Sequence, residues 1–576
     1  MHFKAGKLTV FFDNGSLRYI KFGGLEVLNR IYFAVRDANW ETVKNVVENV
    51  ETQIDDGSFQ LKFDCLCQEN DIDFRWKCEV RGQQDQLIFD IKGQAHSDFK
   101  KNRVGFCVLH PLNCKDRKVT ITHTGGSQSD GRFPNYISPH QPFMDIEAMQ
   151  WNIGPLECQI DFEGDIFETE DQRNWSDASF KTYCTPLELP FPVSMQKGDE
   201  VHQSIKLGIT ETPGREVVSE AEQYALEITG PTSIIPSVGL EANEELLDTW
   251  SVEQLKSLNL SHLRIEARTH EKGWQDGFEK RLQQAKQLGL PIELVIFLKE
   301  EYHRTLATLK ELLDKETVIK SILPIDTNNK STSEEFIQSV IGEIKALFAG
   351  IPIGGGTDCF FTEFNRFRPP FQLIDFVSFS TNPQAHAFDD LSLIETLQTL
   401  PDMLESAEYL ARELPVHVSP VTLKQRFNPN ATTVMEESNG MPSRLDHRHN
   451  TSFNVLWTMG CLKHFAQSGA GTVTFFQTAG EEGTLMPDRP SAFMQYAAAA
   501  HEIFPVFELF KTLGEFKGGR VIHTTSSQPM AFEGMLLEKD VRKSILLANF
   551  TENELSVTLN KEVYTIKPKK MTRFNL

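Results

Sequence analysis

The amino-acid sequence predicts a multidomain α/β plus all-β protein, because its hydrophobic pattern changes twice along the chain. Short alternating stretches run to about residue 225, strand-then-helix units follow, and short alternating stretches return from about residue 515. A chain of 576 residues is also longer than one hydrophobic core normally organises. We therefore predict an antiparallel β-sandwich at 1–228, a (β/α)8 TIM barrel at 229–514 and a small C-terminal β-domain at 515–576.

The N-terminal part alternates apolar and polar residues with the period of a β-strand. "KLTVFF", "SFQLKFDCLC" and "QLIFDIKGQA" are rich in β-branched and aromatic residues, and "DNGS" and "DDGS" supply turns between such stretches. This density of short strands is typical of two packed antiparallel sheets. A polar, proline-containing insertion at 123–194 interrupts the rhythm, and long irregular segments of compact domains are often functional.

The central part repeats a strand followed by a helix. "SHLRIEAR" precedes "GWQDGFEKRLQQAKQLG", "PIELVIFL" precedes "YHRTLATLKELLDK", and the last unit pairs "AGTVTFFQTAG" with a helix expected over 491–510. Eight such units over about 280 residues have the size and order of a TIM barrel. An open doubly-wound sheet is the alternative, but it rarely needs eight units, and no GxGxxG opens a helix.

Composition narrows the possible partners and compartment. The net charge of −22 disfavours nucleic acid and anionic membranes, which both reward positive patches. No window offers eighteen uncharged apolar residues, and the first ten residues lead directly into a strand, so we predict a cytoplasmic protein. Nine scattered cysteines without a CxxC pair predict reduced thiols. His447 and His449 form an HxH without a supporting carboxylate pattern, and we predict neither a metal nor a cofactor.

In a TIM barrel the reactive groups gather at the carboxyl ends of the strands. Polar residues at those ends are expected in almost any barrel enzyme, so their position makes them candidates and does not by itself identify a site. The expected strand ends carry Glu241, Arg264, Glu266, Arg268, Glu300, Glu301, Asp326, Glu363, Asn365, Arg366, Asn382, Gln384, His386, Ser419, Thr422, Arg426, Gln477 and Thr478.

Two of these residues are the candidate catalysts. Glu363 follows a glycine-rich, aromatic stretch in "GGGTDCFFTEFNRFRPP", and the nearby arginines would keep its carboxylate ionised beside an acidic or carbonyl substrate. His386, in "NPQAHAF", suits a base or a hydrogen-bonding partner of the substrate. Arg264 beside Glu266 fits either substrate binding or a structural ion pair. There is no GxSxG elbow and no phosphate loop.

The insertion holds a second polar patch, "FETEDQRNWSDASFKTY". Arg173 and Trp175 lie among charges of both signs, which suits a loop that covers a small polar ligand and completes a pocket between domains. The same residues would also suit a solvated edge strand.

Several motifs together resemble one family, the D-apionate lactonases of bacterial sugar-acid catabolism. They are "NRIYFAVRDANWETV", "NRVGFCVLHPL", "SPHQPFMDI", "EDQRNWSDASFKTY", "FTEFNRFRP", "NPQAHAFDD" and "SPVTLKQRFNP". The resemblance implies a β-domain, a TIM barrel, a β tail and a hydrolase that opens D-apionolactone to D-apionate. The last barrel strand of the family often ends in an acidic residue, whereas this chain has Gln477, which cannot act as a base or nucleophile.

Lactone hydrolysis needs a base that activates water and donors that stabilise the oxyanion. We predict Glu363 as the base and His386 as the next candidate. The substrate-binding residues predicted are Arg264, Glu266, Asn365, Arg366, Gln384, Gln477, Arg173 and Trp175. A glycoside hydrolase that pairs Glu363 with Glu241, Glu266 or Asp326 is the main alternative, and a non-catalytic sugar-binding protein is a third.

Overall fold

A computed structural model describes residues 1–212, 223–299, 302–313, 315–427 and 441–576. The chain forms two compact units, Met1–Arg173 with Ala178–Ala221 and Asn174–Asp177 with Glu222–Leu576. Residues 174–177 thus belong to the second unit, although they are embedded in the sequence of the first. In the described ranges, no helix has the length and apolar character that crossing a membrane requires.

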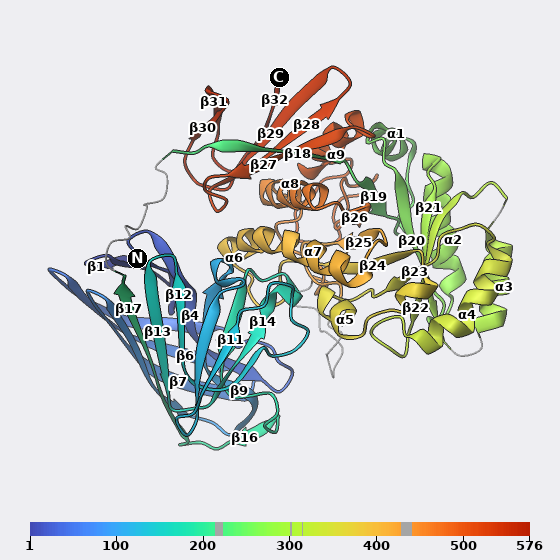
Figure 1. Ribbon diagram of the computed structural model, residues 1–576. Helices are drawn as coiled ribbons and strands as arrows, with labels where there is room; N and C mark the ends of the chain where they lie inside the picture. Colours follow the sequence, from blue (N-terminus) through green and yellow to red (C-terminus); the bar gives the residue numbers. More distant parts are fainter. Residues whose placement is uncertain (213–222, 300–301, 314, 428–440) are drawn as a thin grey trace. The chain divides into compact units, whose positions relative to one another are not determined.

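The first unit is an antiparallel β-domain built on one continuous sheet of 17 strands (Figure 1). The prediction of antiparallel β-structure is confirmed. The strands are β1 (His2–Ala5), β2 (Leu8–Asp13), β3 (Ser16–Phe22), β4 (Leu25–Asp37), β5 (Asn45–Asp55), β6 (Ser58–Glu69), β7 (Ile72–Gln83), β8 (Gln86–Ala95), β9 (Phe99–Pro111), β10 (Lys118–His123), β11 (Gln128–Arg132), β12 (Phe143–Ile153), β13 (Leu156–Glu163), β14 (Phe167–Asp171), β15 (Ser179–Tyr183), β16 (Val193–Met195) and β17 (Glu200–Glu211).

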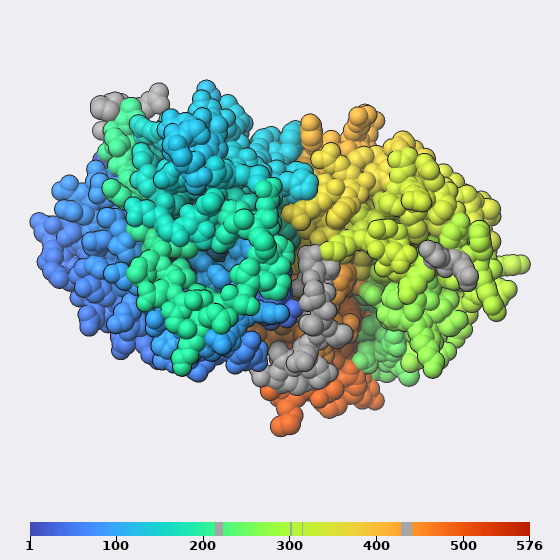
Figure 2. Space-filling view, turned by 90° about the horizontal axis from the view of Figure 1, so that it is seen from below, coloured from blue at the N-terminus to red at the C-terminus, as the bar shows by residue number. Residues whose placement is uncertain are grey.

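One aromatic core fills this sheet. The alternating residues of β7 are buried on one face only, as a period of two requires. The ring centre of Phe106 lies 5.0 Å from that of Phe89 and 5.6 Å from that of Phe33, and both pairs meet edge-on. Such edge-to-face pairs are the favoured arrangement of aromatic rings, which explains how one core absorbs so many phenylalanines. The residues of this unit form the blue and teal surface in Figure 2.

The second unit contains an eight-stranded parallel barrel, which confirms the predicted TIM barrel. Its strands are β19 (Ser237–Glu241), β20 (His262–Arg268), β21 (Ile292–Leu298), β22 (Ile319–Asp326), β23 (Gly354–Gly356), β24 (Phe376–Thr381), β25 (Val416–Val421) and β26 (Thr472–Gln477). The order runs β22-β21-β20-β19-β26-β25-β24-β23. The ends meet where the amide of Ile322 donates to the carbonyl of Pro352 at 2.9 Å.

Helices follow the strands around the barrel (Figure 1). They are α1 (Thr249–Ser257), α2 (Trp274–Leu288), α3 (Tyr302–Leu312), α4 (Glu334–Leu347), α5 (Phe361–Arg366), α6 (Asp390–Glu395), α7 (Leu400–Ala411), α8 (Ser452–Gln467) and α9 (Val506–Glu515). Helix α4 shows why they form where they do. The side chain of Ser333 accepts from the amide of Phe336, Glu334 and Glu335 lie in the first turn, and Ile337, Val340 and Ile344 are buried.

The helix expected over 491–510 is mostly absent, because α9 begins only at Val506. The preceding residues are held by local bonds of another kind: the amide of Phe493 donates to the hydroxyl of Ser491. Pro505, inside the expected range, also cannot donate to a helical ladder. The alanine-rich pattern was therefore overridden by this proline and by side-chain bonds.

The C-terminal β-structure combines strands from both sides of the barrel in the sequence. Its five-stranded antiparallel sheet orders β18 (Leu226–Ile234), β27 (Arg520–Ser526), β28 (Phe532–Lys539), β29 (Arg542–Asn549) and β32 (Met571–Asn575). A hairpin of β30 (Leu555–Leu559) and β31 (Glu562–Ile566) packs on the same apolar core.

The glycines of β23 are required by close packing. A Cβ on Gly354 would lie 2.3 Å from the ring of Phe376. A Cβ on Gly356 would lie 2.0 Å from the carbonyl oxygen of Ser378, and its φ of +143° is unfavourable for other residues. The glycine run of the sequence therefore lets β23 fit against β24.

We predict that Gly356→Ala lowers the free energy of unfolding by about 2–5 kcal/mol, because the strained φ and the contact with Ser378 both cost energy. The measurement is urea unfolding followed by circular dichroism. Gly342→Ala is the matched control: Gly342 is exposed within α4 with open space around its Cβ position, so alanine should stabilise by about 0.5–1 kcal/mol. Equal effects of the two substitutions would contradict this account.

Candidate functional site

Oppositely charged side chains cluster at the carboxyl edge of the barrel. The Nη2 atom of Arg264 lies 2.8 Å from Glu266 and 2.6 Å from Asp358. Arg426, which follows β25, contacts the same two carboxylates at 2.5 and 2.8 Å. Arg268 lies 2.6 Å from Glu266. Strands β20, β23 and β25 thus bring residues far apart in sequence into one buried group, because parallel strands share an edge.

A third carboxylate completes this group. Glu241, the last residue of β19, lies 3.9 Å from Arg426. Burial, together with the charge of Glu266, raises the pKa of Glu241. Burial also acts on Glu266, but the three arginines hold the pKa of Glu266 well below its usual range. We call these six residues the barrel-edge cluster: Glu241, Arg264, Glu266, Arg268, Asp358 and Arg426.

The barrel-edge cluster pairs its own charged groups, because its three guanidinium groups face three carboxyl groups. Arg264 also donates from Nη1 to the carbonyl and the hydroxyl of Ser419, both at 3.2 Å. The predicted pairing of Arg264 with Glu266 is therefore observed as a buried ion pair within a larger network. Its role as a substrate-binding pair stays a prediction.

A small cavity of about 10 Å³ borders this cluster. Asp358, Ser380, Asn382, Thr422, Arg426 and Phe427 are among the residues that line it. Asp358 is 3% exposed, and among the described residues its Oδ2 atom has no hydrogen-bond partner. Its nearest cation is Nη2 of Arg268 at 3.8 Å.

Residues 174–177 bring a second set of polar groups to the barrel. Asn365 on α5 donates from Nδ2 to Oδ1 of Asn174 at 3.0 Å, and the hydroxyl of Ser176 donates to the carbonyl of Asn382 at 2.6 Å. Arg366 lies with its guanidinium carbon 5.2 Å from the ring centre of Trp175. Three of the predicted binding residues, Asn365, Arg366 and Trp175, therefore come together.

His386 joins this group through Asp177. Its Nδ1 atom lies 2.7 Å from Oδ2 of Asp177, and its ring meets that of Trp175 edge-on at 5.4 Å. A carboxylate on Nδ1 fixes the orientation of an imidazole and leaves Nε2 to accept a proton. In the part of the chain that the structure covers, no hydrogen bond engages Nε2. The His386 and Asp177 side chains are partly exposed, at 19% and 15%.

Glu363 lies on α5 and is 3% exposed. Burial raises the pKa of Glu363 to about 7, although its own backbone amide, Lys330 and Arg366 oppose the shift. Its Oε2 atom has no hydrogen-bond partner within the described ranges. A carboxyl group with such a pKa can exchange protons near neutral pH. Glu363 does not line the cavity beside Asp358.

The remaining predicted binding residues have protein partners of their own. Gln384 donates from Nε2 to the carbonyl of Leu423 at 2.6 Å and to Asp446 at 2.7 Å. Gln477 accepts from Nδ2 of Asn243 at 2.8 Å. Arg173 belongs to the first unit, where it is fully buried and pairs with Asp171 at 2.7 Å. Their roles toward a substrate stay predictions.

The other acidic strand ends separate into three cases. Asp326 accepts from the amide of Asn328 at 2.9 Å and from the side chain of Asn329 at 2.5 Å, which is a local turn. Glu300 and Glu301 lie outside the described residues. Glu241 joins the barrel-edge cluster.

Asp358 was missed in the sequence, and Asp177 was recognised only as one charge of the polar insertion, without its partner. Asp358 stands two positions beyond the glycine strand, at the same barrel edge as Arg264, and this position was the available signal. Asp177 lies in the insertion at 123–194 of the sequence, within the segment that joins the second unit, and nothing local in the sequence pairs it with His386.

The structure gives the HxH pair separate surroundings. His449 is buried, and its Nε2 atom lies 2.9 Å from the carbonyl of Gly483, whereas the His447 side chain is 72% exposed. Burial lowers the pKa of His449 to about 4. No group of three or more His, Cys, Asp or Glu side chains suited to a metal ion occurs among the described residues. All nine cysteines are free and buried.

Another charged group lies at the opposite, amino edge of the barrel. Glu293 lies 3.2 Å from Nε2 of His262 and 3.3 Å from Nδ1 of His417. Burial alone would raise the pKa of Glu293, but the two histidines hold it well below its usual range. Because TIM-barrel reactions occur at the carboxyl edge, we assign this group to barrel packing.

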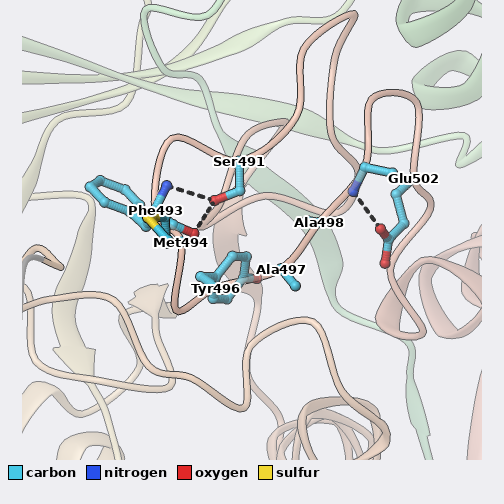
Figure 3. A pocket seen from close by; sticks show the side chains of 8 residues that line it. Ser491, Phe493, Met494, Tyr496, Ala497, Ala498 and Glu502 are labelled. Carbon is cyan, nitrogen blue, oxygen red and sulfur yellow. Dashed lines mark hydrogen bonds between the residues drawn. The ribbon is translucent and has the colours of Figure 1, made fainter.

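A larger hollow of about 460 Å³ lies in the segment between β26 and α9 (Figure 3). Its polar side chains are engaged locally: Glu502 accepts from the amide of Ala499 at 2.7 Å, and the hydroxyl of Tyr496 donates to the carbonyl of Glu481 at 2.9 Å. Neither histidines nor paired carboxylates line this hollow, so it lacks the groups that hydrolysis needs.

Comparisons with known proteins give matches over most of the chain. A family model for the N-terminal domain of D-apionate lactonase matches residues 1–212, and one for its TIM barrel domain matches residues 237–518. A D-apionate lactonase from Brucella anthropi is 30% identical over 565 residues, which cover 92% of this chain and 89% of that protein.

Among solved structures the likenesses are weaker. A family 51 α-L-arabinofuranosidase from Bifidobacterium longum has a TM-score of 0.41 and 11% identity, over 59% of this chain and 88% of its own. A GH30 endoxylanase from Clostridium papyrosolvens C71 has a TM-score of 0.39 and 8% identity, over 62% of this chain and 99% of its own. Similarities this weak carry no argument about function.

The pKa of Glu363 predicts a pH-dependent stability. Because this pKa is raised in the folded state, the contribution is fully present below about pH 4.5 and is lost as the pH rises through about 7. Between pH 5 and pH 8 the wild type should lose about 2–3 kcal/mol of unfolding free energy relative to Glu363→Gln. Urea unfolding of both proteins at the two pH values measures this, and a difference that does not change with pH would contradict it.

Proposed function

The chain belongs to the D-apionate lactonase family, and we propose that it hydrolyses D-apionolactone to D-apionate. The family predicted from the sequence motifs is confirmed, and so is a lactonase as the class of enzyme. We propose this substrate because the relative in Brucella anthropi is a D-apionate lactonase. The observation that carries the mechanism proposed below is the contact between His386 and Asp177.

We assign the general base to His386. Its Nε2 atom takes a proton from water, while the water oxygen forms a bond to the carbonyl carbon of the lactone. Asp177, on Nδ1, stabilises the imidazolium that results. The tetrahedral intermediate then collapses, the bond from the carbonyl carbon to the ring oxygen breaks, and His386 returns the proton to the leaving alkoxide. The product is a hydroxy acid.

The developing oxyanion needs a donor near the base. Arg366 supports this role, because its guanidinium lies over the same Trp175 ring that His386 meets edge-on. Arg426 lines the cavity beside Asp358, but its guanidinium already donates to Asp358 and Glu266. Arg264 is less suited, since its guanidinium already donates to Glu266, Asp358 and Ser419.

Two observations favour His386 over Glu363 as the base. The imidazole has an orienting carboxylate and is partly exposed, whereas the Glu363 carboxyl is almost fully buried. A base must reach both water and the substrate carbonyl. Glu363 remains the alternative base, because a pKa of about 7 would allow it to accept a proton near neutral pH.

A glycoside hydrolase is a second candidate function, favoured by the opposite pKa shifts of Glu241 and Glu266. Their surroundings move the two pKa values in opposite directions, which is how one site keeps a proton donor beside an ionised carboxylate. Against it, Glu266 is held by three arginines and has no free oxygen for a sugar carbon.

The test is a pH-stat assay of the purified protein on D-apionolactone, run beside aryl glycosides, with and without EDTA. Lactone opening that EDTA leaves unchanged, without turnover of glycosides, is the expected result. Turnover of a glycoside with no effect on the lactone would replace the proposal with the second candidate. Loss of activity in EDTA would overturn the metal-free mechanism.

We predict that His386→Gln lowers kcat for the lactone by about 10²–10⁴-fold, the usual effect of removing a general base. Asp177→Asn should lower kcat by a smaller factor, because the imidazole stays but loses its orientation. Steady-state kinetics measures both effects.

His447→Gln is the matched control, because that histidine is largely exposed and its nearest carboxylate atom is 3.8 Å away. It should retain wild-type kinetics. A folded His386→Gln protein with wild-type kcat would remove His386 from the mechanism, and the same measurement on Glu363→Gln would then identify the alternative base.

A further inference from the structure

Asp358 holds a carboxylate oxygen without a partner in a buried place. Its Oδ1 atom accepts from Arg264 at 2.6 Å and from Arg426 at 2.8 Å. Its Oδ2 atom has no hydrogen-bond partner among the residues that the structure describes. A buried polar atom left without a hydrogen bond costs about 1–3 kcal/mol, so such an atom calls for an explanation.

The cavity beside Asp358 fixes the size of the missing partner. Its volume of about 10 Å³ is close to the least that one water oxygen needs. A sugar ring is too large for this volume, whereas a single hydroxyl group has about the size of a water molecule. Other groups on the cavity wall are engaged with the protein: Ser380 donates to the carbonyl of Cys359 at 2.6 Å, and the hydroxyl of Thr422 donates to that of Lys424 at 2.6 Å.

Charge fixes the chemistry of this partner. A carboxylate oxygen accepts hydrogen bonds, so the partner must donate one. An anion is disfavoured next to Asp358 and Glu266, and a further cation is disfavoured next to Arg268 and Arg426. A neutral hydroxyl satisfies both conditions, and it would form a charge-assisted hydrogen bond.

We propose that Asp358 is a specificity-determining residue whose Oδ2 atom accepts a hydrogen bond from one hydroxyl group of the lactone. This inference rests on the proposed function and deepens it, because it defines the substrate as a polyhydroxylated lactone.

The position of the cavity supports this assignment. Asn382 lines the cavity, and its carbonyl accepts from Ser176, the neighbour of Asp177. The loop after β24 therefore carries both a wall of the cavity and, at His386, the proposed base. A ring whose hydroxyl is held by Asp358 would have its position fixed relative to this loop.

The experiment compares D-apionolactone with analogues in which one hydroxyl at a time is replaced by hydrogen. For the wild type, kcat/KM should fall by roughly 10²–10⁴-fold for one analogue, because sites built to bind a hydroxyl reject substrates that lack it. In Asp358→Asn, kcat/KM for the parent lactone should fall toward the wild-type value for that analogue, while kcat/KM for the analogue should change little. Asp326→Asn is the control: both carboxylate oxygens of Asp326 already have partners, so the ratio between the two substrates should not change.

The outcomes separate this inference from the proposed function. No hydrolysis of D-apionolactone by the wild type would overturn the proposed function and the inference with it. Hydrolysis of the parent and of every analogue at similar rates would overturn only the inference. An equal loss on all substrates in Asp358→Asn would also overturn it, because the residue would then act without contacting the hydroxyl. The series on the wild type decides the question even if Asp358→Asn does not fold.

Discussion

The carboxyl edge of the barrel depends on one constraint, which is that buried charges must be paired. The barrel-edge cluster brings together three arginines and three carboxylates. They come from strands as far apart in the sequence as β19 and β25. Removing one partner of such a group leaves an uncompensated buried charge, which is far more costly than losing one surface ion pair. The cluster therefore holds the strand ends in a fixed arrangement and gives each of its three arginines a carboxylate partner.

This pairing shapes the chemistry proposed for the site. Arginines that already bind carboxylates attract an anionic substrate only weakly, whereas a neutral lactone meets no charge penalty. The base then comes from outside the cluster. His386 fills that role because Asp177, which is separated from it by about 200 positions in the sequence, lies against its Nδ1 atom. Residues 174–177 belong to the barrel unit because they contact it: Asn365, Arg366 and Asn382 all lie against them.

The fold was largely predictable because its signals are local and periodic. Eight strand-then-helix units, alternating strands before and after them, and the glycines of β23 can each be recognised within a short window. The helix expected over 491–510 was wrong where Pro505 and bonds such as that of Ser491 overrode propensity. The family was also predictable, because its motifs recur in order along the chain.

The site was only partly predictable, since it depends on long-range contacts. His386 and Arg264 could be placed at the barrel edge from their strand ends alone. Their partners could not: Asp177 lies in a short segment embedded in the sequence of the β-domain, and no local motif pairs Asp358 with Arg264 and Arg426. Glu363 appeared ionised in the sequence because arginines follow it, but burial is the larger effect and raises its pKa to about 7.

The most direct test of this account measures binding of two unreactive ligands by calorimetry at low and high salt. One is the neutral lactam that mimics the lactone ring, and the other is the open D-apionate anion. An edge whose arginines are already paired predicts that the lactam binds more tightly and that salt hardly changes its affinity. Tighter binding of the anion, with an affinity that falls steeply as salt is added, would contradict the account, because the arginines would then be available to a carboxylate.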